Sequence, residues 1–340
     1  MGGSREASPS ISVVMPVHNA LPYLDESIGS ILGQTFTDFE FVILDDASTD
    51  GSNAALRRWA RKDARIRLYQ GRHKLGLTGS SNFVVRKARA PLIARMDADD
   101  VSHRERLRKQ WETIERDPDI ALVGTLYDGI DARGRRVRPR DRWRLAWRTV
   151  FPPFPHGSVL FRRAIFDEVG GYREECAGWE DQDLFLRLKS RGRVVVLTET
   201  LYHYRFHVSS VMCGAAAASA ARVIGLRHRC LAEFRRGRDY TRLLAEAERN
   251  GPPPTAFADA LYLRGSMRLW AGHPPAILGL VLRHKSLALG PRALRTLVWA
   301  TWASVSPTSL RLFLRALIRT RDFLASYSVK DRGIYEWRLG

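Results

Sequence analysis

The feature that most constrains the fold is a regular alternation of β-rich and helix-like stretches over the first hundred residues. Short runs rich in Val, Ile, Leu and Phe alternate with segments whose apolar residues recur at helical spacing. The pattern predicts strands at Ile11–Met15, Phe39–Leu44, Ile66–Tyr69 and Pro91–Met96, and helices at Tyr23–Leu32, Asn53–Lys62 and Ser81–Ala88. Such alternation is typical of βαβ units, so it predicts an α/β fold with a mostly parallel sheet flanked by helices.

Polar clusters follow three of these predicted strands, at Pro16–Asn19, Asp45–Asp50 and Asp97–Asp100. In open parallel sheets ligands gather at the carboxyl ends of the strands. We therefore expect a binding site where these three clusters meet.

The last of these clusters, Asp97-Ala98-Asp99-Asp100, holds three carboxylates in four residues. Carboxylates this close repel one another unless a cation or solvent compensates their charge. Mg²⁺ and Mn²⁺ prefer such oxygen ligands and bind through one or two carboxylates plus substrate phosphates. Taken alone, the cluster fits either a metal site or a solvated acidic loop.

The order of the motifs resolves this choice. The chain carries SVVMPVHN at 12–19, DDASTDG at 45–51, GLTGSSN at 76–82, IARMDADD at 93–100, HGSVLFRR at 156–163, EVGGYR at 168–173, WEDQDL at 179–184 and YRFH at 204–207. This series resembles glycosyltransferase family 2, the inverting transferases with a GT-A fold, over residues 11–212. The resemblance implies transfer of a sugar from a nucleotide-sugar donor, UDP-linked first and dTDP-linked next, to a hydroxyl acceptor in polysaccharide, cell-envelope or glycolipid biosynthesis.

The resemblance also implies roles for individual residues. Positions matching the nucleotide contacts are Pro16, Val17, His18, Asn19, Asp46, Gly76, Asp97 and Ala98. Asp99 and His207 match ligands of a divalent ion, Mn²⁺ or Mg²⁺. Asp181 matches the catalytic base, which takes the proton of the acceptor hydroxyl. Residues assigned to the sugar and acceptor pocket are His156, Trp179, Glu180 and Asp183.

Several assignments have a structural alternative: Asp46 also fits a helix cap, and His207 an ordinary surface histidine. His18 also reads as an ordinary loop histidine, and Trp179 as a core residue. A helix predicted over Trp179–Leu188 would favour the acids of its first turn simply through its dipole. One departure from the family pattern is Ser81, where many members carry Arg facing the diphosphate; Lys74, Arg86 and Arg95 are the candidate replacements.

The net charge of +19 is concentrated in the last third of the chain. Residues 213–340 hold 21 Lys and Arg against 8 Asp and Glu, with Leu, Trp and Phe between them. This composition predicts that residues 214–340 form a basic α-helical region. The chain would then consist of a flexible N-terminus (1–10), a catalytic domain (11–213) and this helical region. Its basic amphipathic helices fit a peripheral membrane contact, a soluble bundle or a homo-oligomer interface.

Composition excludes several other classes of protein. With 45% hydrophobic residues and only 3 Cys, the chain is neither disordered nor a disulfide scaffold. No signal peptide or spanning stretch is evident, so we expect a cytoplasmic protein at most peripheral to the membrane. The basic excess alone would suit a nucleic-acid-binding protein, but no reading module accompanies it, and no nucleic-acid partner is expected. A catalytically inactive family relative is the other alternative.

Overall fold

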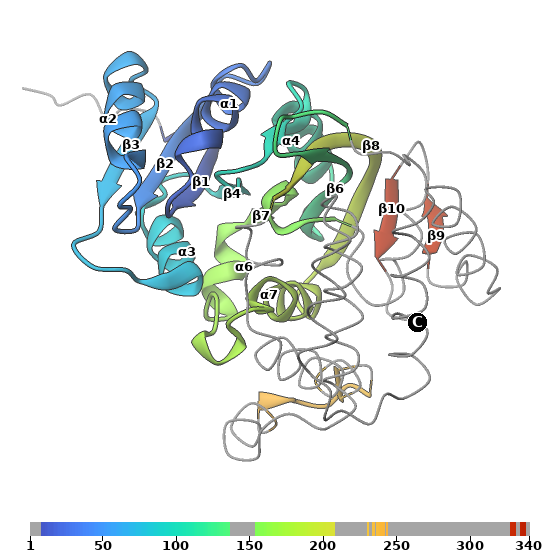
Figure 1. Cartoon of the computed structure of the whole chain (residues 1–340). Coiled ribbons are helices and arrows are strands. Elements are labelled where there is room, and N and C mark those ends of the chain that lie inside the picture. Colours follow the sequence, from blue (N-terminus) through green and yellow to red (C-terminus); the bar gives the residue numbers. More distant parts are fainter. Residues whose placement is uncertain are drawn as a thin grey trace, which may run out of the picture.

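The computed structural model describes residues 8–136, 154–207, 230, 233–234, 236–241, 243, 327–330 and 334–337. Strands of these residues form one sheet in the order β3-β2-β1-β4-β7-β6-β8-β10-β9, with the short β5 pairing beside β8. Helices pack on both faces of this sheet (Figure 1). The expected α/β architecture is confirmed.

The N-terminal half is parallel, as the alternation predicts. Its strands are β1 (Ile11–Val17), β2 (Phe39–Asp45), β3 (Ile66–Gln70) and β4 (Leu92–Arg95). They are connected by α1 (Leu21–Leu32), α2 (Ser52–Lys62) and α3 (Gly76–Lys87). Helix α3 begins at Gly76, five residues before the predicted start at Ser81. The prediction missed these residues because the stretch 76–80 lacks the apolar periodicity that marks a helix.

The second half of the sheet is mixed. It contains β5 (Val101–Ser102), β6 (Ile120–Asp131), β7 (Leu160–Arg162) and β8 (Arg193–Phe206). Strand β7 runs antiparallel to both β4 and β6, whereas β6 and β8 are parallel. The remaining elements here are α4 (Arg106–Glu115), α6 (Arg163–Glu168), α7 (Glu180–Lys189) and the 3₁₀ turns η1 (His156–Ser158) and η2 (Glu174–Cys176).

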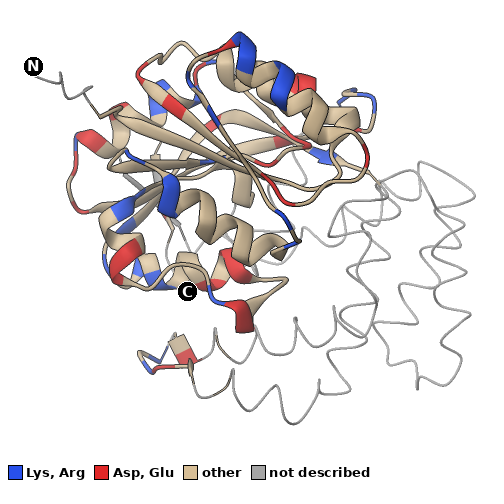
Figure 2. Ribbon diagram, turned by 90° about the vertical axis from the view of Figure 1, so that its left-hand side faces the viewer, with Lys and Arg blue, Asp and Glu red and all other residues tan. Residues whose placement is uncertain are grey.

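Two apolar layers sandwich the sheet. On one face, α1, α2 and α4 bury Leu24, Leu56 and Ile114. On the other, α3, α6 and α7 bury Val84, Phe166 and Leu184. Successive residues of a strand point to opposite faces, so β1 supplies Val13 to the first layer and Val14 to the second. In Figure 2 the Lys and Arg positions (blue) and the Asp and Glu positions (red) lie mainly on the helices and loops.

The two ends of the chain depart from expectation. Of the ten N-terminal residues expected to be flexible, Ser8 and Ser10 are tied to Arg89 and Asp38 by hydrogen bonds. The all-helical prediction for 214–340 is wrong at its end, where β9 (Tyr327–Lys330) and β10 (Ile334–Trp337) form an antiparallel hairpin that extends the sheet beside β8.

The sequence of this hairpin explains the correction. The strands read Tyr-Ser-Val-Lys and Ile-Tyr-Glu-Trp, which combine aromatic and β-branched residues with polar ones, and Asp-Arg-Gly separates them. The helices expected elsewhere in 214–340 lie almost entirely outside the described residues. No helix in the described ranges is long and apolar enough to cross a membrane.

Candidate active site

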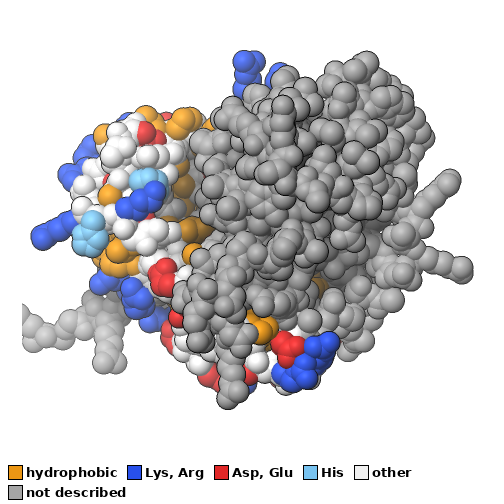
Figure 3. All heavy atoms as spheres, turned by 60° about the horizontal axis from the view of Figure 1, so that its bottom comes forward, with side chains coloured by type: hydrophobic (Ala, Val, Ile, Leu, Met, Phe, Trp, Pro, Cys, Tyr) orange, Lys and Arg blue, Asp and Glu red, His pale blue; other side chains and the backbone are white. Residues whose placement is uncertain are grey.

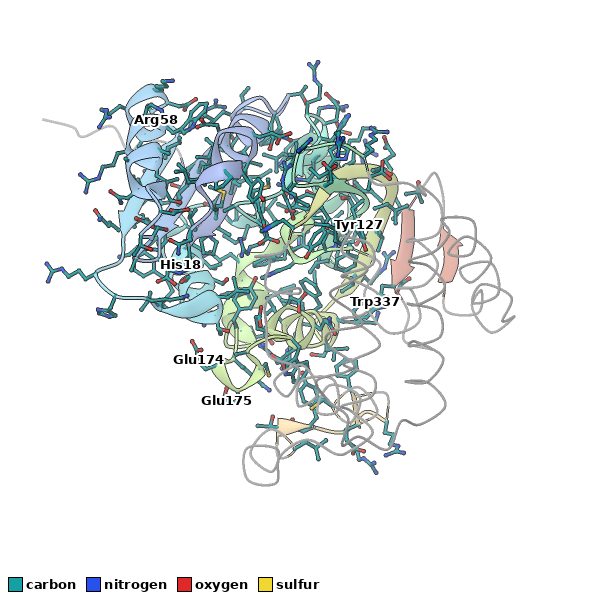
Figure 4. The ribbon with its side chains drawn as sticks, viewed as in Figure 1. His18, Arg58, Tyr127, Glu174, Glu175 and Trp337 are labelled. Atoms are coloured by element: carbon teal, nitrogen blue, oxygen red, sulfur yellow. The ribbon has the colours of Figure 1, made fainter. Side chains whose placement is uncertain are left out.

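The ends of β1 and β2 are joined by hydrogen bonds between their loops. The His18 Nδ1 lies 2.8 Å from the Asp46 carbonyl oxygen, and the Asn19 amide donates to the Ser48 hydroxyl. Asn19 adopts a left-handed conformation with φ of 53°, which asparagine tolerates better than most residues. The His18 side chain is exposed at this edge, and Figure 4 shows it between the ends of β1 and α3.

The adjacent acids Asp45 and Asp46 have different partners. The buried Asp45 carboxylate accepts from the Ser48 amide and the Asn53 side chain, which fixes the entry into α2. The Asp46 carboxylate accepts from the amides of Leu75 and Gly76 at 2.6 and 3.0 Å. Asp46 therefore holds the loop before α3 against the end of β2 and brings Gly76 to this edge.

Three of the expected nucleotide contacts present little side chain to a ligand. Val17 is buried in the core, and Ala98 is nearly so. Pro16, the last but one residue of β1, is half-buried. These positions offer mainly backbone at the pocket edge.

Asp97 lies beyond the end of β4 beside two close neighbours. One carboxylate oxygen pairs with the Arg95 guanidinium at 3.0 Å, and the backbone N–H of Gly157 also hydrogen-bonds the carboxylate. A Cβ at Gly157 would stand 2.8 Å from the other oxygen and 1.9 Å from the Tyr202 hydroxyl. Burial raises the pKa of Asp97 more than Arg95 lowers it.

Asp99 and His207 form the candidate metal pair. An Asp99 carboxylate oxygen lies 2.8 Å from the His207 Nε2, and the imidazole packs against the Tyr23 ring. The described residues contain no group of three or more His, Cys, Asp or Glu placed to share an ion. Two protein ligands fit a cation that completes its shell with phosphate oxygens and water.

Asp100 is a structural member of the acidic cluster. It is buried, and one carboxylate oxygen accepts from the Arg205 amide at 2.7 Å. Burial, together with the charges of Asp99 and Asp97, raises its pKa well above the usual value. The buried Arg205 guanidinium also donates to the Asp99 carbonyl oxygen and pairs with Glu26.

Helix α7 begins with the other acids. Its first turn contains Glu180, Asp181 and Asp183, and Trp179 precedes it. Asp181 is partly exposed. Glu180 is buried and accepts from the Gly178 amide; burial and the neighbouring charge of Asp181 raise its pKa to about 7.

The other two pocket candidates on α7 are internal. The Asp183 carboxylate has no exposed surface and is bound by Arg187 and Tyr240. Trp179 is 2% exposed and packs in an apolar cluster, as in the core alternative. Neither side chain is presented to a ligand in this structure.

A polar chain connects α3, η1 and the loop before α7. The Asn82 side chain makes two hydrogen bonds to the backbone of Tyr172, whose hydroxyl lies 2.7 Å from the His156 Nε2. Burial and Arg95 lower the pKa of His156 well below its usual value, so its ring is neutral near pH 7. Burial raises the pKa of the Tyr172 hydroxyl, and the charges of Asp181, Glu180 and Asp97 add to this effect. Because the neighbouring Gly157 N–H bonds Asp97, these contacts link Asp97 to the segment that leads into α7.

Comparison with known proteins identifies the family. A model described as "Glycosyl transferase family 2" matches residues 12–172. The putative glycosyltransferase EpsE of Bacillus subtilis is 35% identical over 208 residues, which are 58% of this chain and 74% of EpsE. The O-antigen biosynthesis glycosyltransferase WbnJ of Escherichia coli is 32% identical over 246 residues, covering 69% and 92% of the two chains. The chain belongs to glycosyl transferase family 2.

Solved structures confirm the GT-A fold of this glycosyltransferase. A mannosyltransferase from Pyrobaculum calidifontis, PcManGT, in complex with GDP-Man and Mn²⁺, has a TM-score of 0.55 at 21% identity and covers 92% of this chain and 85% of its own. Residues 1–349 of S. aureus TarS, in complex with UDP-GlcNAc, have a TM-score of 0.55 at 19% identity, covering 91% and 88%.

This family 2 member lacks the arginine expected at Ser81, and the structure separates the three candidate replacements. Ser81 is buried in α3. Arg86 lies in the last turn of that helix, about 15 Å from its start at the site edge. Lys74 is exposed two residues before Gly76, and Arg95 is buried beside Asp97. Of the three candidates, Lys74 and Arg95 therefore remain near the strand ends.

Sequence reasoning missed the buried residues that support the acidic cluster. Arg106 donates to the carbonyl oxygens of Arg95 and Gly157, and the Tyr202 hydroxyl lies 3.4 Å from the Asp97 amide. Burial lowers the pKa of Arg106 to about 10. No signal in the sequence marks Arg106, because it stands in a charged run with Arg104, Glu105 and Arg108 that is typical of an exposed helix face.

Proposed function

We propose that this glycosyltransferase moves a sugar from a nucleoside-diphosphate donor to an acceptor hydroxyl in one inverting displacement. The observation that carries the proposal is a chain of contacts between the two acid groups. The Gly157 N–H of η1 bonds Asp97 at the end of β4, and the adjacent His156 bonds the hydroxyl of Tyr172, in the segment that leads to Asp181 at the start of α7. One group suits the donor's ribose and diphosphate, and the other suits the acceptor.

In the proposed reaction, the acceptor oxygen attacks the anomeric carbon and its proton passes to the Asp181 carboxylate. The bond between that carbon and the diphosphate oxygen breaks, and the nucleoside diphosphate leaves with the electron pair. A base on the face opposite the leaving group is what inversion requires. The partial exposure of Asp181 at a helix start leaves room for an acceptor hydroxyl.

The donor and the ion are part of the same proposal. Asp99 and His207 would hold Mn²⁺ or Mg²⁺, which supplies charge stabilisation to the departing diphosphate. The exposed His18 suits stacking on a flat pyrimidine base. The buried Asp46 carboxylate already accepts from the Leu75 and Gly76 amides and would use its remaining lone pairs for an imide N–H, which favours UDP and then dTDP. PcManGT is bound to GDP-Man and TarS to UDP-GlcNAc, so a guanine donor belongs in the test.

A donor screen tests the proposal. The purified chain is incubated with Mn²⁺ or Mg²⁺ and a panel of UDP, dTDP and GDP sugars, and released nucleoside diphosphate is measured. Asp181→Asn should abolish transfer and keep nucleotide binding. Asp25→Asn is a matched control, because Asp25 is an exposed acid on α1 paired with Arg58. Full transfer by Asp181→Asn would refute the base assignment, and no turnover or binding of any donor would refute the function.

We further propose an acceptor at a membrane surface, reached from the cytoplasmic side. Two observations support this proposal. The relative WbnJ is an O-antigen biosynthesis glycosyltransferase, and the excess of basic residues in this chain lies in residues 213–340. Where the described residues are visible in Figure 3, basic and acidic side chains are interspersed. Binding to anionic vesicles that weakens with salt, and fails with neutral vesicles, is the expected result.

A further inference from the structure

The start of α7 is supported by a segment that lies some fifty residues further along the chain. Cys230 and Tyr240 are buried in one cluster with Cys176 and Trp179, and Phe234 and Leu243 pack at its margin. This segment, coloured orange in Figure 1, lies below α7. Residues from the C-terminal region therefore form part of the packing around the loop that leads into α7.

Polar contacts reinforce this packing at Asp183. The Tyr240 hydroxyl donates to one carboxylate oxygen at 2.8 Å, and the Arg173 guanidinium lies 3.8 Å from the same oxygen. Arg187 donates to the other oxygen through two nitrogens, one of them at 3.0 Å, and a third nitrogen binds the Val169 carbonyl oxygen. A carboxylate with no exposed surface needs such partners, because burying an unpaired charge is costly.

The supported residues bracket the proposed base. Trp179 lies two residues before Asp181 and packs in the cluster, and Asp183 lies two residues after it and is bound by Tyr240. All three belong to the first turn of α7 or its cap. Displacement of either flank would move the Asp181 carboxylate, and misplacement of about 1 Å can cost about a hundredfold in rate.

We propose that Tyr240 is a positioning residue, through which the C-terminal region holds the first turn of α7 and its base Asp181 in the geometry needed for transfer. This inference rests on the proposed function of Asp181. It gives part of the C-terminal region a role in catalysis, in addition to any contact that the region makes with a membrane.

The test uses the full chain with Tyr240→Phe, which removes one hydroxyl and keeps the ring in the cluster. Tyr69→Phe is the matched control: Tyr69 also carries a bonded hydroxyl, which accepts from Arg67. It lies on β3, the edge strand at the far end of the sheet from β6 and β8, on which α7 packs. We expect Tyr240→Phe to lower kcat about tenfold, with the donor KM unchanged within about twofold. We also expect faster amide hydrogen exchange in residues 178–186, and neither effect in Tyr69→Phe.

The two readouts separate the inference from the proposed function. Unchanged exchange in 178–186, or faster exchange spread over the whole chain with kcat unchanged, would overturn the positioning role of Tyr240. Absence of transfer by the wild-type protein would instead refute the proposed function. In that case the exchange result alone would show whether Tyr240 holds this turn.

Discussion

At the scale of single residues, Gly157 shows how closely the site is packed. An added Cβ would overlap the Tyr202 hydroxyl at 1.9 Å and press on the Asp97 carboxylate at 2.8 Å. We expect Gly157→Ala to lower the free energy of unfolding by ~1–3 kcal/mol, as overpacking does, and to weaken nucleotide binding by displacing Asp97. Urea denaturation and a nucleotide titration measure the two effects.

Gly29→Ala is the control for this substitution. Gly29 lies inside α1, and a Cβ there meets nothing within 4 Å. Alanine should therefore leave stability unchanged or raise it by ~0.5–1 kcal/mol. Equal destabilisation by the two substitutions would contradict the steric account of Gly157.

Glu180 is expected to make the stability of the protein depend on pH. Burial and Asp181 raise its pKa from 4.5 to about 7, so the folded protein keeps a proton that the unfolded chain releases near pH 4.5. The stability from this group is present below pH 4.5 and is lost as the pH rises to 7. Relative to Glu180→Gln, the wild-type protein should lose about 1 kcal/mol of unfolding free energy per pH unit in this window.

Denaturation at pH 5 and pH 8 checks this expectation. Glu115→Gln, at an exposed position near the end of α4, serves as the control and should show no such difference from the wild type. If the difference in unfolding free energy between Glu180→Gln and the wild type is the same at both pH values, the pKa of Glu180 is not raised.

At the scale of elements, the acidic loop after β4 is stabilised by guanidinium groups buried beneath it. Arg95, Arg106 and Arg205 are each at most 1% exposed, and Arg95 pairs directly with Asp97. A double-mutant cycle with Arg95→Met and Asp97→Asn should give a coupling energy of ~1–3 kcal/mol, because Arg95 is buried, Asp97 is largely so, and each single change leaves one of them without its partner. The exposed pair Arg58–Asp25 should give at most ~1 kcal/mol by the same cycle. Similar values for the two pairs would show that burial of Arg95 adds nothing.

Elements also show where prediction from sequence succeeds. Strands β1, β2 and β4 are fully buried or nearly so and are mostly apolar in sequence, so their positions were predictable. Helix α4 and strand β6 were absent from the prediction. In α4 the buried face includes Arg106, Gln110 and Thr113, polar residues that only the folded surroundings explain.

The candidate site also contains residues that the sequence indicates and residues that only the fold explains. The sequence singled out acids that the structure places at the ends of β2 and β4, because charge next to an apolar run is conspicuous. It did not distinguish the buried Asp183 from the partly exposed Asp181, since both lie in one helical turn. Asp183 differs from Asp181 in being bonded by Tyr240, which lies fifty-seven positions further along the chain. No local pattern in the sequence reveals such a contact.

At the scale of the whole molecule, the C-terminal end of the described chain returns to the catalytic sheet. Strand β10 pairs with β8, and Trp337 is buried in the same apolar layer as α3, α6 and α7. Its ring contacts Phe154 edge-on, and the Lys189 ammonium lies over it. Figure 4 shows Trp337 beside β10 at the margin of this layer. Residue 213 is therefore not the limit of the catalytic fold, because residues 327–337 contribute to its sheet and core.

The packing of Trp337 leads to a prediction about the stability of the intact protein. Trp337→Ala should lower the free energy of unfolding by ~3–5 kcal/mol, since it removes a large buried side chain from the core. Trp59→Ala, at a partly buried surface tryptophan paired with Asp25, should cost clearly less. If the two cost the same in urea denaturation, β10 does not pack on the core as described. If Trp337→Ala also abolishes nucleotide binding, the hairpin stabilises the catalytic sheet as one cooperative unit with its site, because the strand ends that carry Asp46 and Asp97 belong to that sheet.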